Sequence, residues 1–173
     1  MEAGAPPKQD PEADHDPFAG YSQQEQPLAG RITLVTAFGA CLATAGLAAR
    51  ITGREPPERP HPADVVMIGV ATHKLSRLLA KSKATSFIRA PFTELEAPRG
   101  TGEVDEKPRG EGVRRAVGEL LVCPYCLSQW ISAGFSTGLV LAPRVTRLVA
   151  ASYSAQTLAD FLQLAYRAAC ARA

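Results

Sequence analysis

Charged and apolar positions are segregated along this chain of 173 residues, and four stretches are almost free of charge. The first is the uncharged run 32–49, bracketed by one arginine on each side, so we expect residues 31–50 to be a candidate transmembrane helix. At about 1.5 Å per residue such a helix is just long enough to cross a bilayer core. The alternative is an alanine-rich helix buried in a soluble core. The other three stretches are the first half of 64–83, the uncharged run 120–142 and the segment 148–166.

These segments predict an all-α protein of the integral membrane class, with four apolar helical segments and three to four transmembrane helices. No alternating pattern typical of a β-strand is present. The segment 84–95 resembles a helix lying in the membrane interface, and residues 97–112 are rich in Gly, Pro and charge, as in a flexible loop.

The remaining segments predict the domain organisation. Residues 1–30 hold five prolines and six acids, so we expect a disordered acidic tail. Residues 51–63 are rich in proline and predict a stiff linker. Residues 64–173 then form a helical membrane domain with a basic loop at 82–116.

The basic and acidic residues bear on the partner class and on the orientation of the helices in the membrane. Nineteen Lys and Arg against seventeen Asp and Glu are too near neutrality to favour a nucleic-acid partner. If all four segments cross, residues 81–115 and both termini share one side, which then holds twelve bases against five on the other. The positive-inside rule therefore predicts a multi-pass protein of the cell membrane with both termini in the cytoplasm.

Cys123-Pro124-Tyr125-Cys126 is the short motif that carries chemistry. Since Pro124 favours the first position of a helix, we expect a helix to begin afresh there, with Cys123 near its cap. A helix N-terminus stabilises a thiolate. A glutaredoxin domain is excluded, because the residues that follow are helical and apolar.

Three hypotheses for the two cysteines stay open. The pair supplies half of a zinc site, with His73 as a third ligand. Alternatively it is a membrane dithiol that exchanges electrons with a quinone or a partner thiol, with Glu119 as its proton partner. In the third hypothesis the two side chains simply pack at a helix interface.

Polar residues inside the apolar segments need partners. We expect Arg77 or His73 to meet Glu119 and Asp160, forming either a proton path or structural ion pairs. Serines recur every four residues along one face, which favours close approach of another helix; these are Ser128, Ser132 and Ser136.

From Asp64 onward the chain resembles a family of small bacterial membrane proteins known as domain of unknown function 1360. The resemblance rests on three stretches: ATHKLSRLL (71–79) with SFIRAPF (86–92), GVRRAVGELLVCPYCLSQW (112–130), and the closing apolar helix. It implies an integral membrane protein and no established activity.

We therefore expect a non-enzymatic membrane scaffold that contacts the bilayer and an unknown membrane or cytoplasmic protein, without a cofactor. The alternatives are a thiol-disulfide oxidoreductase using Cys123 and Cys126, or a metal-binding membrane protein. Zinc and quinone belong to these alternatives alone.

Overall fold

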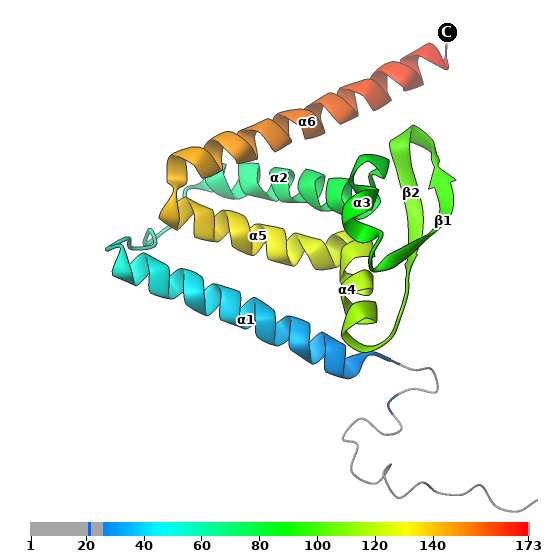
Figure 1. The fold of residues 1–173 in the computed structure, drawn as a ribbon. Coiled ribbons are helices and arrows are strands. Elements are labelled where there is room, and N and C mark those ends of the chain that lie inside the picture. The colour runs from blue at the N-terminus through cyan, green and yellow to red at the C-terminus, as the bar shows by residue number, and fades with distance from the viewer. Residues whose placement is uncertain (1–20, 22–25, 173) are drawn as a thin grey trace, which may run out of the picture.

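A computed structural model describes residue 21 and residues 26–172, and this part of the chain is mostly helical, as expected. Figure 1 shows the arrangement of the elements. In chain order they are α1 (Leu28–Ile51), α2 (Pro62–Lys81), η2 (Lys83–Thr85), α3 (Ser86–Arg89), β1 (Thr93–Arg99), η3 (Gly100–Gly102), β2 (Glu103–Pro108), α4 (Gly112–Val122), α5 (Pro124–Leu141) and α6 (Pro143–Cys170).

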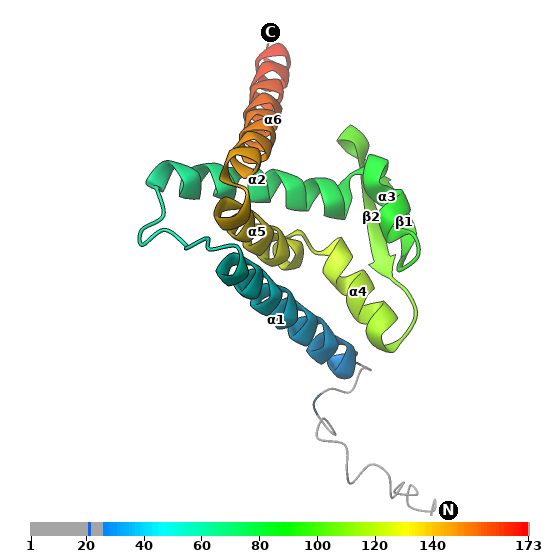
Figure 2. The ribbon, with the colours of Figure 1, turned by 60° about the vertical axis from the view of Figure 1, so that its left-hand side comes forward.

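The long helices α1, α2, α5 and α6 alternate in direction between two ends of the molecule (Figure 1). One end, here called the hairpin end, carries α3, β1 and β2. The other, the linker end, carries the connection between α1 and α2 and the turn between α5 and α6. The start of α1 and the C-terminus both lie toward the hairpin end. The C-terminal half of α6 leaves the bundle (Figure 2), and residues 158–170 are exposed.

The packing of α2 against α5 and α6 relies on small side chains. A cluster of Ile68, Ala71, Phe135 and Ala150 forms the core, and the two alanines are fully buried. The hydroxyl of Ser154 on α6 donates to the backbone carbonyl of Met67 on α2 at 2.9 Å. Small residues and hydroxyl-to-carbonyl bonds between helices are typical of helix packing in membranes.

Helix α1 rests on α4 and α5. Gly30 lies so close to α4 that an added Cβ would come within 2.7 Å of the Gly112 carbonyl oxygen. Further along, the rings of Phe38 and Trp130 meet edge to face with centroids 5.0 Å apart. A glycine contact and an aromatic pair thus fix α1 at two levels.

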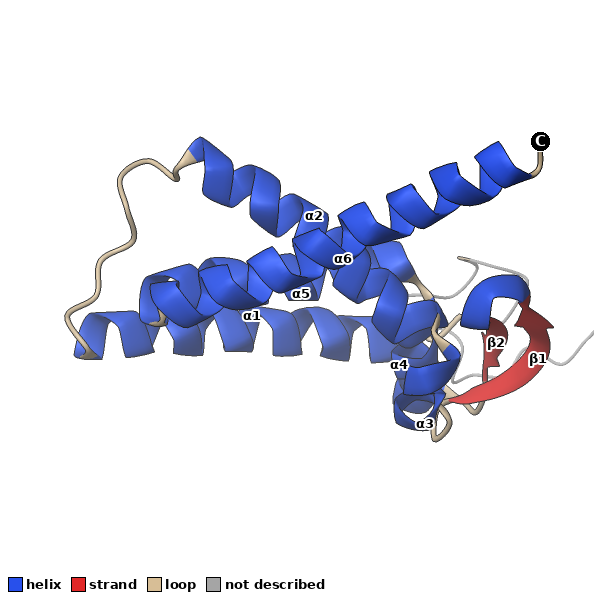
Figure 3. Cartoon of the chain, turned by 90° about the horizontal axis from the view of Figure 1, so that it is seen from above, coloured by secondary structure: helices blue, strands red, loops and turns tan. Residues whose placement is uncertain are grey.

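The predicted basic loop at 82–116 is wrong. In this segment β1 and β2 form an antiparallel hairpin, with Thr93 opposite Pro108 and Arg99 opposite Glu103 (Figure 3). The register shifts between Leu95 and Ala97, as at a β-bulge. Because both strands are rich in charge and nearly all of β1 is exposed, no apolar alternation marks them in the sequence.

A buried ion pair anchors this hairpin. Arg89 is fully buried and its guanidinium donates to both carboxylate oxygens of Glu106, at 2.9 and 2.8 Å. It also donates to the carbonyls of Leu79 and Ser82, so the end of α2 and strand β2 are bound through one side chain. Burial raises the pKa of Glu106, but the hydrogen bonds from Arg89 and Thr93 and the positive charges of Arg89 and Lys81 together lower it by more, and the net pKa is below its ordinary value.

The apolar segment 120–142 divides at Cys123 into α4 and α5, with Pro124 at the first position of α5. This break is the one expected from the proline. The expected tail 1–30 lies largely outside the described residues, although its last three positions belong to α1.

Within the described residues, α1 is the single helix long and apolar enough to cross a membrane by itself. None of its most apolar window is buried inside the protein. By length and composition alone, α2, α5 and α6 do not reach that level.

Candidate functional site

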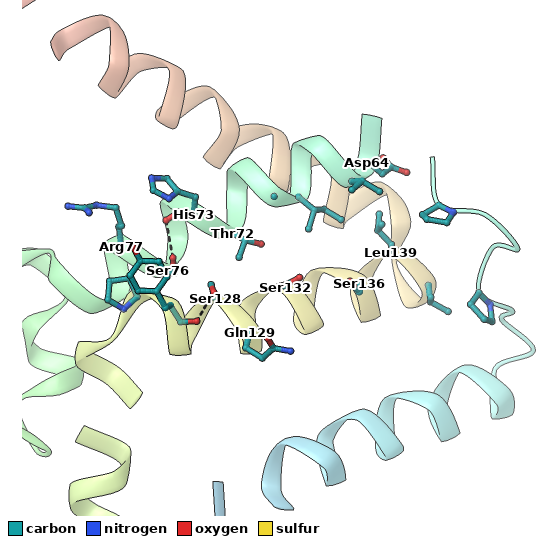
Figure 4. Close-up of a pocket in the computed structure, with 18 of the residues that line it drawn as sticks. Asp64, Thr72, His73, Ser76, Arg77, Ser128, Gln129, Ser132, Ser136 and Leu139 are labelled. Carbon is teal, nitrogen blue, oxygen red and sulfur yellow. Dashed lines mark hydrogen bonds between the residues drawn. The ribbon is translucent and has the colours of Figure 1, made fainter. Parts of the chain in front are cut away.

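A cavity of about 840 Å³, lined by both polar and apolar side chains, lies between α2 and α5 and is the first candidate site. Figure 4 shows hydroxyl-bearing side chains from both helices along it. Thr72 and Ser76 come from α2, and Ser128, Ser132 and Ser136 come from α5. As expected, α5 lies against another helix, α2, but its serines border an open space between the two helices.

The hydroxyls differ in how they are satisfied. Ser76 donates to the carbonyl of His73 at 3.0 Å, and Ser128 donates to the carbonyl of Tyr125 at 2.7 Å. Thr72 is 7% exposed, and its Oγ1 is the buried side-chain oxygen in the described residues that has no hydrogen-bond partner. Its side chain projects from α2 toward α5 (Figure 4). An unsatisfied buried hydroxyl costs roughly 1–3 kcal/mol, so it needs an explanation.

Cys123 and Cys126 form the second candidate site. Cys123 caps α5: the backbone N–H of Cys126 donates to its Sγ at 3.2 Å. Both thiols are free, Cys126 is exposed and Cys123 is half-buried. The cap position expected for Cys123 is thus the observed one, because Pro124 restarts the helix there.

Cys126 opens onto an apolar groove of about 420 Å³ between α1, α4 and α5. Glu119 and Trp130 line the same groove. The carboxylate of Glu119 accepts hydrogen bonds from Arg31 at 2.9 Å and from Arg115 at 3.5 Å. The contact with Arg31 ties α4 to α1, and the role of Glu119 as a proton partner of the thiols stays a prediction.

The expected partners of the intramembrane charges are wrong. Arg77 pairs with Glu103 of the hairpin at 2.6 Å. Asp160 pairs with Lys74 at 2.6 Å. The reason is tertiary: the hairpin brings acids to the end of α2, and Lys74, not His73, reaches Asp160 on α6.

His73 lines the cavity between α2 and α5, away from the groove that Cys126 lines. Across the described residues no group of three or more His, Cys, Asp or Glu side chains is placed to hold a metal ion. The zinc hypothesis therefore gains no support from this geometry.

Two residues that matter here were not singled out from the sequence. Arg89 holds the hairpin, and Thr72 carries the unsatisfied hydroxyl. A useful signal for Thr72 was the spacing of four residues to Ser76, which places two hydroxyls on one face of α2. Arg89 could not be singled out in this way, because its role depends on pairing with a strand that the hydrophobic pattern of the sequence did not reveal.

Comparison with protein families matches residues 67–166 to the family described as Protein of unknown function (DUF1360). The match covers most of α2, the whole hairpin end, α5 and most of α6. No curated protein and no solved structure matches the chain.

Proposed function

Since the chain belongs to the DUF1360 family of unknown function, we propose from its structure that it is a multi-pass, non-enzymatic membrane component. In this proposal α1, α2, α5 and α6 cross the bilayer. The hairpin end faces the cytoplasm and binds a protein partner.

The observation that carries the proposal is the distribution of apolar side chains. Large apolar residues lie exposed on α1, α2 and α6, while the buried apolar core between α2, α5 and α6 is a small cluster of Ile68, Ala71, Phe135 and Ala150. Water would penalise this arrangement, whereas lipid solvates the outer side chains. The exposed residues include Ile32, Leu42 and Leu47 of α1, Val66 of α2, and Leu158, Phe161, Leu162 and Leu164 of α6.

The distribution of bases supports the orientation. Residues 81–115 at the hairpin end contain eight Lys and Arg, while the linker end has Arg50, Arg54, Arg59, Arg144 and Arg147. The alternating helix directions bring both ends of residues 28–172 toward the hairpin end. By the positive-inside rule this end is cytoplasmic.

The hairpin offers the partner surface. In the described part of the chain β1 pairs with β2 alone, and β2 is the strand that packs on α4. The outer edge of β1 is therefore free to accept a strand, and Leu95 on it is exposed.

Topology is tested with single cysteines in a protein whose four native cysteines are replaced by serine. Glu58→Cys lies at the linker end and Lys83→Cys at the hairpin end, and both native side chains are exposed. We expect an impermeant maleimide to label position 58 in intact cells and position 83 only after permeabilisation. Labelling of position 83 in intact cells, or recovery of the protein in the soluble fraction, contradicts the proposal.

The partner role is tested by a photocrosslinking residue at position 95, with position 83 as the matched site outside the strand. We expect a discrete crosslinked species from position 95 and none from position 83. Equal, diffuse crosslinking from both positions contradicts a partner at β1.

A thiol oxidoreductase is the second candidate, favoured by the N–H of Cys126 directed at Sγ of Cys123. Cys123 would attack a partner disulfide, and Cys126 would then displace the second partner thiol. The chain's two thiols become a disulfide as the partner's disulfide becomes two thiols. Cys123→Ser with Cys126→Ser separates the candidates: the scaffold keeps its crosslink and cellular role, and the oxidoreductase loses its role while staying folded.

A further inference from the structure

The cavity between α2 and α5 has a mixed lining. Along α2, from the hairpin end toward the linker end, the polar side chains of Arg77, Ser76, His73 and Thr72 come first and the apolar side chains of Ile68 and Val65 follow. Asp64, which pairs with Arg147, then closes the far end. Along α5, Tyr125 and the three serines are followed by Leu139 and Val140. Apart from the paired Asp64, both helices thus place polar side chains toward the hairpin end and apolar ones toward the linker end, an order that suits an elongated amphiphile.

We propose that this cavity binds one anionic phospholipid of the surrounding bilayer, with its phosphate at Arg77 and His73, an ester carbonyl at Thr72 and an acyl chain along Ile68 and Leu139. This inference rests on the proposed membrane location. The charged end of the cavity lies on the hairpin side, at the level where that proposal places the headgroups of the cytoplasmic leaflet.

The charged end is suited to an anion. Arg77 gives one ion pair to Glu103, but its side chain is 47% exposed, which leaves guanidinium donors open. His73 lies one helical turn from it and is also exposed. The acid that lines the far end, Asp64, is engaged by Arg147 at 2.8 and 2.9 Å.

Thr72 identifies the middle of the site. Arg77 lies five positions after Thr72, about 7.5 Å along the helix axis, comparable to the spacing of a lipid phosphate and its ester groups. Rotation about Cα–Cβ exchanges the hydroxyl and the methyl at the lining, and threonine populates two such rotamers in helices. A lipid carbonyl would then accept the hydrogen bond that the hydroxyl lacks within the protein.

The first test compares Thr72→Val with Thr157→Val. Both threonines are 7% exposed, but Thr157 donates to the carbonyl of Tyr153 and lies outside the cavity lining. The full chain, purified in detergent, is titrated with phosphatidylglycerol, phosphatidylcholine or oleate, and binding is followed by native mass spectrometry and thermal shift. We expect Thr72→Val to keep or raise the lipid-free melting temperature, because it removes the unsatisfied hydroxyl, and to bind phosphatidylglycerol about fivefold more weakly. Thr157→Val keeps the wild-type affinity.

The second test compares Arg77→Gln with Arg99→Gln. Each removes a partly exposed arginine that pairs with an acid of the hairpin, but only Arg77 lines the cavity. We expect Arg77→Gln to abolish the preference for phosphatidylglycerol over phosphatidylcholine and Arg99→Gln to retain it.

Several results would overturn the inference: unchanged affinity in Thr72→Val, equal binding of the two phospholipids by wild type, oleate binding as tightly as phosphatidylglycerol, or a quinone as the copurified occupant. Carbonate extraction of membranes distinguishes a failure of the lipid site from a failure of the proposed membrane location. A chain that stays in the membrane without lipid selectivity refutes the lipid site alone, and a chain that is extracted refutes both.

Discussion

The buried pair of Arg89 and Glu106 gives the sharpest prediction about stability. Glu106→Ala removes the carboxylate and leaves a fully buried guanidinium without its counter-charge. Breaking a buried ion pair in this way costs about 3–5 kcal/mol. A two-stranded hairpin is marginal on its own, so we expect the loss to open the hairpin locally and leave the long helices folded.

The assay is amide hydrogen exchange of residues 93–108, followed by mass spectrometry. We expect exchange in Glu106→Ala to be about 10²–10³-fold faster, up to the rate of an unprotected chain. Glu94→Ala is the matched control on the same hairpin, since Glu94 is 60% exposed and lies 3.6 Å from Lys107. Its loss is expected to cost under about 1 kcal/mol.

A double variant and a pH series separate charge from packing. Arg89→Met with Glu106→Leu removes both charges and recovers part of the protection, but the carbonyls of Leu79 and Ser82 lose their donor. Because the pKa of Glu106 is lowered in the folded state, the pair's contribution is complete above the ordinary value of 4.5. It is lost as the pH falls below that value through the folded-state pKa. Wild-type protection of the hairpin in Glu106→Ala would refute the reasoning.

Three further predictions concern the helices. Gly30→Ala places a methyl against the backbone of α4 and is expected to lower the free energy of unfolding by about 1–3 kcal/mol. Gly46→Ala is the control: nothing lies within 4 Å of its added methyl, so we expect the free energy of unfolding to stay the same or to rise by up to about 1 kcal/mol. Equal melting temperatures for the two variants would show that α1 does not depend on this contact. Cys123→Ser preserves the cap of α5, and Cys123→Ala is expected to lower stability by about 1 kcal/mol; a larger loss for serine contradicts the capping role. Asp160→Asn leaves Lys74 without its partner, which costs about 2–3 kcal/mol if α6 lies in lipid but under about 1 kcal/mol if it lies in water. The abundance of this variant in membranes therefore tests the environment of α6. The control is Lys74→Gln with Asp160→Asn, which removes both charges.

Local features of the sequence determined much of the helical frame. The apolar runs located the long helices, and the linker rich in proline separated α1 from α2. Pro124 alone predicted the restart of the helix and the cap at Cys123. These outcomes depend on backbone and side-chain chemistry within one or two turns, which a single sequence displays directly.

Tertiary structure decided what lies opposite each polar group. Arg31 meets Glu119 across 88 positions, and Lys74 meets Asp160 across 86, so no local spacing encodes either pair. The hairpin was missed because its strands are held by Arg89 and α4 and not by an apolar face of their own. The serines of α5 formed a stripe in the sequence, whereas the hydroxyls of α2 were not singled out, and the packing of the two helices brought both sets to a single cavity.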